Sequence, residues 1–204
     1  MALKRREQER QNRRLMLLEA ASQVFGRKPF DEASIQEVAA EAEIGIQGLY
    51  EHFPSKQDLY EAVMVHRAQL FHARTEEALR PPGSPLERLR ALALAYVTLF
   101  KDRPMVLPMF IRDRSLFDWG LDSRFAPALR QLYLDERHRL TLVIQAAVEA
   151  GEIQSLDPEF LTQLVLDVLQ SSLHTMHHAR GSETPETCVE RAMSCLLHGV
   201  GGRP

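Results

Sequence analysis

Residues 34–56 read SIQEVAAEAEIGIQGLYEHFPSK, a stretch that predicts two short helices joined by a tight turn. Ser34 can cap the first helix, and Glu37 three residues later can complete a reciprocal capping box. Apolar residues then recur at helical spacing, at Ile35, Val38, Ala39 and Ala42. The first of the two helices therefore presents one apolar face to a core.

The second helix is predicted over residues 46–52, with Gly45 as its N-cap. It ends at Phe53, because a residue that precedes proline is driven out of helical geometry. Ser55 then caps a further helix that begins at Lys56. Two short helices joined by a turn of about three residues form a helix-turn-helix, whose second helix enters the major groove of DNA.

This stretch, with the helix before it, resembles the DNA-binding domain of TetR-family transcriptional repressors. The resemblance covers about residues 14–64 and is most specific in the run Gly48-Leu49-Tyr50-Glu51-His52-Phe53-Pro54-Ser55-Lys56, with Leu59 after it. Further matching residues are Leu17-Leu18-Glu19-Ala20-Ala21, Val24-Phe25, Phe30, Ser34-Ile35 and Val38-Ala39. The resemblance implies a helix-turn-helix DNA-binding domain over residues 1–56 and a ligand-binding and dimerisation domain over residues 57–204. It also implies a non-enzymatic homodimeric repressor, which a small molecule releases from a palindromic operator.

Several positions depart from the family pattern. Glu43 stands in the turn where the family usually has glycine, and Pro29 replaces another glycine after the first helix. The run from Gly45 to Gly48 lacks the basic residue that the family usually carries there. A second hypothesis therefore stays open, in which the chain is a helical small-molecule-binding protein with weak or lost DNA binding.

The N-terminal fourteen residues form a basic segment with six Lys or Arg against two Glu. We expect a flexible arm that reaches phosphates or the minor groove beside the helix-turn-helix. The alternative is a solvated terminus without a function. Because the net charge of the chain is −3, any DNA contact must come from such a local patch.

Within the predicted DNA contacts, Tyr50, His52 and Lys56 correspond to residues that face the phosphate backbone in the family. Gln47 suits an adenine edge in the major groove. The full set of predicted DNA-binding residues is Arg5, Arg6, Ser34, Gly45, Ile46, Gln47, Gly48, Tyr50, His52 and Lys56.

Residues 104–124 read PMVLPMFIRDRSLFDWGLDSR, which is too apolar for a solvated loop and too rich in proline for a long helix. Methionines and aromatic residues together make an adaptable apolar surface, so we expect this segment to border a small-molecule site. Ordinary core packing is the alternative for each single residue. The predicted effector-binding residues are Phe100, Met105, Met109, Phe110, Phe117, Trp119, Phe125, Tyr133, Gln145 and Leu164. The expected effector is hydrophobic or aromatic.

The rest of the chain predicts further helices and no strands, giving an all-α fold of about nine helices. The last two helices, over about residues 157–181 and 184–197, are apolar on more than one side. We expect them to pack against a second copy of the chain across a two-fold axis, with Leu169 and Leu196 in that interface.

The sequence favours neither an enzyme nor a membrane protein. It holds no phosphate-binding or nucleophile motif and no run of about 18 apolar residues, and its charged start lacks a signal-peptide pattern. Two cysteines, Cys188 and Cys195, are too few for a disulfide framework, so a cytoplasmic location is expected. His174 and His178 lie four apart and could hold a metal, but they lack a third ligand, so no cofactor is expected.

Overall fold

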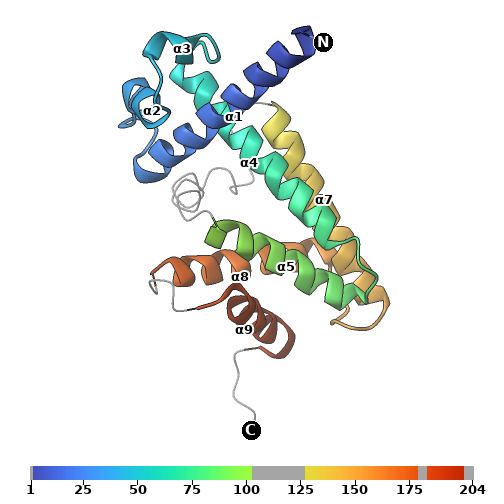
Figure 1. Cartoon of the computed structure of the whole chain (residues 1–204). Helices are drawn as coiled ribbons and strands as arrows, with labels where there is room; N and C mark the ends of the chain where they lie inside the picture. Colours follow the sequence, from blue (N-terminus) through green and yellow to red (C-terminus); the bar gives the residue numbers. More distant parts are fainter. Residues whose placement is uncertain (1, 103–126, 179–182, 200–204) are drawn as a thin grey trace. The chain divides into compact units, whose positions relative to one another are not determined.

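The computed structural model describes residues 2–102, 127–178 and 183–199, and every regular element within those ranges is an α-helix (Figure 1). The helices are α1 (Ala2–Arg27), α2 (Ile35–Glu41), α3 (Ile46–Tyr50), α4 (Lys56–Ala78), α5 (Pro85–Asp102), α7 (Pro127–Glu149), α8 (Pro158–His178) and α9 (Pro185–His198). The predicted all-α class is confirmed, and the expected number of helices is close to the eight described.

The chain divides into two compact units. The first contains α1, α2, α3 and α4 as far as Ala68. The second contains α4 from Gln69 onward, α5, α7 from Gln131, α8 and α9. No helix in the described ranges is long and apolar enough to cross a membrane.

The first unit has a continuous apolar core to which all four of its helices contribute. Leu49 is the one buried residue of α3, and with Phe53 just beyond the helix it fixes α3 on this core. Three rings meet nearby: Phe25 and Phe30 lie 4.9 and 5.0 Å from Tyr60, centroid to centroid. The buried members are Leu17, Leu18, Ala21, Val24, Phe25, Ala33, Ile35, Val38, Ala39, Leu49, Phe53, Leu59, Tyr60, Val63 and Met64.

The caps predicted from the sequence are present. The amide of Glu37 donates to the Ser34 hydroxyl at 3.2 Å, and the Glu37 carboxylate accepts from the Ser34 amide at 2.9 Å. The amide of Asp58 likewise donates to the hydroxyl of Ser55 at 3.1 Å. Gly45 is the N-cap of α3, which ends at Tyr50, two residues before its predicted end.

The turn after α2 is a Schellman motif, with Glu43 in the left-handed conformation at a φ of 54°. The amide of Glu43 donates to Ala40 and that of Ile44 donates to Ala39, which satisfies two terminal carbonyls of α2. Glycine is the usual residue at such a position, because a side chain costs free energy there. Glu43 therefore builds the same turn as glycine, with strain.

In the second unit, α5 packs against α8 and α9. Tyr96 of α5 lies edge-on to Phe71 at 5.6 Å between ring centroids, and burial raises the pKa of its hydroxyl. Leu169 of α8 is only 3% exposed within the single chain. The expectation that Leu169 faces a second copy is therefore wrong, because the residue already packs in the core of its own unit.

Candidate nucleic-acid interface

The exposed face of α3 is uncharged. Ile46 is 41% exposed and Tyr50, one turn later, is 48% exposed, while Leu49 on the opposite side is fully buried. Gln47 is also exposed, and Gly48 is half-buried. The predicted base-reading residues therefore lie together on one surface, but this surface offers no cation to a phosphate backbone.

The cations come from α1. The Arg14 guanidinium donates from Nη1 to the carbonyl oxygen of His52 at 3.1 Å and lies 4.2 Å from the centroid of the Phe53 ring. Burial lowers the pKa of His52, and the charges of Arg10, Arg14 and Arg13 lower it further. Three arginines of α1 thus gather where α3 ends.

We call Arg10, Arg13 and Arg14 the basic face of α1. Their spacing of three and four residues puts them on one side of the helix. These three arginines lie within the basic segment that was predicted to reach phosphates, but only Arg5 and Arg6 were named there as individual site residues. The helical spacing of the three arginines was a signal that could have found them, had the segment been taken as a helix.

The N-terminal segment is not the flexible arm that was expected, since α1 begins at Ala2. Residues 4–16 are exposed, yet they continue the helix without a break. Side-chain pairs four residues apart support it, such as Arg5 with Glu9 at 2.8 Å and Gln8 with Asn12 at 3.1 Å. No glycine or proline interrupts the segment, so the core-bound half of α1 extends into it.

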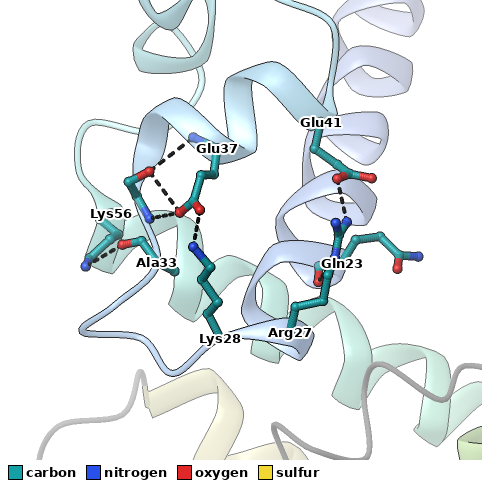
Figure 2. A network of polar contacts seen from close by, with 8 residues as sticks. Gln23, Arg27, Lys28, Ala33, Glu37, Glu41 and Lys56 are labelled. Carbon is teal, nitrogen blue, oxygen red and sulfur yellow. Dashed lines mark hydrogen bonds and ion pairs between the residues drawn. The ribbon is translucent and has the colours of Figure 1, made fainter.

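Lys56 is held by the protein itself. Its Nζ donates to the carbonyl oxygen of Ala33 at 2.9 Å (Figure 2). It also donates to the carbonyl oxygen of Phe30 at 2.7 Å and lies 4.4 Å from the centroid of the Phe30 ring. The ammonium ties the loop after α1 to the start of α4. A phosphate contact by Lys56 stays a prediction. A phosphate would have to share the Lys56 ammonium with the two carbonyl oxygens.

A second polar network joins the end of α1 to α2 (Figure 2). Arg27 pairs with Glu41, and Lys28 pairs with Glu37. The bond from Lys28 and the two bonds from Ser34 lower the pKa of Glu37 from 4.5 to about 2. Both pairs border a surface hollow of about 370 Å³, also lined by Val24 and Ala40. Because Arg27 and Lys28 are already paired with carboxylates, they are less available to an outside anion than the basic face at the other end of α1.

Two family models match this chain. The one described as "Bacterial regulatory proteins, tetR family" matches residues 17–63, and the one described as "Tetracyclin repressor-like, C-terminal domain" matches residues 82–200. The chain belongs to the TetR family. It is thus a helix-turn-helix, DNA-binding transcription regulator, as the resemblance in its N-terminal residues implied.

Individual TetR-family relatives extend this finding. The transcriptional repressor KstR2 of Mycolicibacterium smegmatis is 31% identical over 93% of this chain and 91% of its own. The transcriptional activator FasR of the same species is 37% identical, but over 43% of this chain and 40% of its own. Among solved structures, FadR from Bacillus subtilis in complex with stearoyl-CoA has a TM-score of 0.76 at 14% identity, covering 92% of this chain and 99% of its own. KstR2 of Mycobacterium tuberculosis has a TM-score of 0.74 at 19% identity, covering 94% and 96%. Both structures share the TetR fold.

Of the predicted effector-binding residues of this TetR-family chain, the described side chains are those of Tyr133, Gln145 and Leu164. The side chain of Phe100 and the residues Met105, Met109, Phe110, Phe117, Trp119 and Phe125 lie outside the described residues. Tyr133 is half-buried, and burial raises its pKa. Gln145 is exposed and donates to Glu149 at 2.9 Å, and Leu164 is 38% exposed. Gln145 and Leu164 therefore lie on the surface of the second unit. Among the described residues, no group of three or more potential ligands could hold a metal ion.

Proposed function

We propose that this TetR-family protein represses transcription by binding a palindromic operator as a homodimer, and that a small, largely apolar effector releases it. The basic face of α1 beside the end of α3 is the observation that carries the DNA part of this proposal. Phosphate contacts supply most of the affinity of such proteins for DNA. They also position the helix that reads the bases, which we call the reading helix and which is α3 in this chain. Here α1 supplies the cations, and α3 supplies an uncharged reading surface.

The size of α3, the helix proposed to read bases, supports the homodimer. A single helix of five residues contacts few base pairs, whereas two copies can occupy half-sites about 34 Å apart. On the second unit, Phe160 and Leu164 of α8 are 57% and 38% exposed and lie one helical turn apart. An apolar stripe of this kind suits an isologous contact between two copies of α8.

The apolar effector is supported by the composition of residues 104–124 and by two relatives. One relative is FadR, solved with stearoyl-CoA, and the other is KstR2, described as a ketosteroid transcriptional regulator. We extend their chemistry to this chain as a class only: a long acyl chain or a fused-ring hydrocarbon carrying few polar groups. Such a ligand would match a segment rich in methionine and aromatic residues.

Helix α4 offers a route for the release, since it begins in the first unit and ends in the second. Its second half is tied to α7 by Glu136, which accepts from the Thr75 hydroxyl at 2.8 Å and lies 2.6 Å from Nδ1 of His72. An effector that separates these groups would free the end of α4. By linkage, the effector and the operator then weaken each other's binding equally.

The test is binding of the purified protein to a duplex that it selects from a random pool. The variant Arg10→Ala/Arg13→Ala should bind more weakly, and its affinity should depend less on salt, with a slope smaller by about one unit for each lost phosphate contact. Arg88→Ala, which removes an exposed arginine of α5, is the matched control and should behave like the wild type. If the wild type selects no duplex, the alternative of a small-molecule binder without DNA function stands instead.

A further inference from the structure

The residue that remains unexplained on the reading helix is Ile46. Its side chain is 41% exposed at the first position of α3, and it is absent from the apolar residues that pack against the core of the first unit. Ile44, two residues earlier, does pack there. Ile46 therefore presents a branched hydrocarbon to solvent on the face that carries Gln47 and Tyr50.

The surroundings of Ile46 leave this hydrocarbon partly exposed. Gly45 precedes it, and a Cβ placed on Gly45 would meet no atom within 4 Å other than those of its chain neighbours. The φ of Gly45 is −70°, so the backbone does not require glycine there. A serine at this N-cap would accept a helix amide, as Ser34 does for α2, so the bare N-cap leaves a local contact unused. The space next to Ile46 is thus open toward whatever approaches α3.

Base edges in the major groove offer one apolar group, the C5-methyl of thymine. Resting on the proposed DNA binding, we propose that Ile46 reads a thymine through that methyl group, with Gly45 leaving room for the contact. The side chain supplies no hydrogen bond and no charge, so it cannot serve a phosphate or a polar base edge. Gln47, the next residue, suits adenine, so α3 is built for steps of A·T pairs.

The lack of a cation on α3 then has a function rather than being a defect. Because the arginines of α1 would hold the DNA phosphates beside α3, α3 needs no cation of its own. Its first turn is free to carry shape and methyl contacts. Base selection and backbone affinity are therefore placed on two different helices, α3 and α1.

The test replaces each thymine of the selected duplex with deoxyuridine, which removes only the methyl group. At one position in each half-site, the wild type should lose about fourfold in affinity, the fold-change expected for burying one methyl. Ile46→Ser should bind the thymine duplex more weakly and should not distinguish it from the uracil duplex at that position. Ile46→Val keeps a branched hydrocarbon and should still distinguish them.

Folding is controlled in the same series, because an exposed residue contributes little to stability. All three proteins should show the same thermal unfolding midpoint. The thymine contact is overturned, while DNA binding stands, if the wild type selects a duplex but no uracil substitution lowers its affinity. The contact is also overturned if the uracil substitution lowers the affinity of Ile46→Ser as much as that of the wild type. If the wild type selects no duplex, the proposed DNA function fails first, and this inference fails with it.

Discussion

Arg14 in α1 donates a hydrogen bond to the carbonyl oxygen of His52, 3.1 Å away and 38 residues later in the chain. The same guanidinium lies over the ring of Phe53, a residue that is 1% exposed in the core. The bond closes the last turn of the helix-turn-helix onto α1. The position of the reading helix therefore depends on an arginine that also faces outward.

We expect Arg14→Ala to lower the free energy of unfolding by about 1–2 kcal/mol, because one charge-assisted hydrogen bond and one cation–π contact are lost. Arg13→Ala removes the same charge without removing this bond, so its stability should stay within about 0.5 kcal/mol of the wild type. Chemical denaturation of the two variants measures the difference. Equal unfolding midpoints would show that the contact with His52 and Phe53 contributes nothing.

Glu43→Gly should stabilise the protein by about 1 kcal/mol, because glycine adopts the left-handed conformation without the clash of a Cβ. Glu43→Gln keeps the strained backbone and removes only the charge, so it should leave stability nearly unchanged. Thermal unfolding of both variants separates backbone strain from charge. A gain of the same size in Glu43→Gln would attribute the effect to the carboxylate.

Stability should fall as the pH drops from about 4.5 towards 2, through protonation of Glu37. The pKa of this carboxyl is about 2 in the folded chain and 4.5 ordinarily, so the folded state binds fewer protons between these values. Its contribution is therefore complete above pH 4.5 and is lost on acidification. Glu37→Gln should flatten this part of the curve of unfolding midpoint against pH. A curve parallel to that of the wild type would contradict the assignment.

DNA binding should take up protons at His52. Burial and the charges of Arg10, Arg13 and Arg14 hold its pKa below 6.5 in the free protein, with Glu51 opposing them. Phosphates at the basic face would offset these charges and raise the pKa, so affinity should increase as the pH falls from about 8 to 6. His52→Gln should bind with less dependence on pH, as measured by titration of labelled duplex. The stability of the free protein should depend on pH in the opposite direction. Because the pKa of His52 is lower in the folded chain than its ordinary 6.5, protonation favours the unfolded chain, and stability should fall as the pH drops below 6.5.

Leu164→Glu should convert the proposed dimer to a folded monomer, because Leu164 is 38% exposed on α8 and a charge there costs the single chain little. Leu169→Glu should instead unfold the second unit, since it puts a carboxylate where the side chain is 3% exposed. Light scattering and circular dichroism together report mass and helical content. A Leu164→Glu protein with the mass of the wild type would exclude this stripe from the interface.

The sequence predicted the local structure of the helix-turn-helix closely. The capping box at Ser34 and the N-cap at Gly45 follow from interactions over a few residues, which the sequence contains in full. Gly151 ends α7 through a similarly local interaction, with a φ of 68° and its amide bonded to Val148. The sequence predicted less well which side of each helix is buried, because a helix with a wide apolar surface such as α8 can face its own core or a partner. Leu169 shows this, having been assigned to the wrong one of those two.

By itself, the sequence determined which segments form helices, where their caps lie and to which family they belong. These features depend on contacts within three or four residues and on side-chain types at fixed spacing. Only the tertiary structure decided which charges are available. It pairs Arg27 with Glu41 and Lys28 with Glu37, and it directs Lys56 to two carbonyls. It also brings the basic face of α1 close enough to His52 for its charges to lower the pKa of that residue. Charges far apart in the chain acquire partners only when folding brings their helices together, so the electrostatics of the surface around α3 is set by the fold.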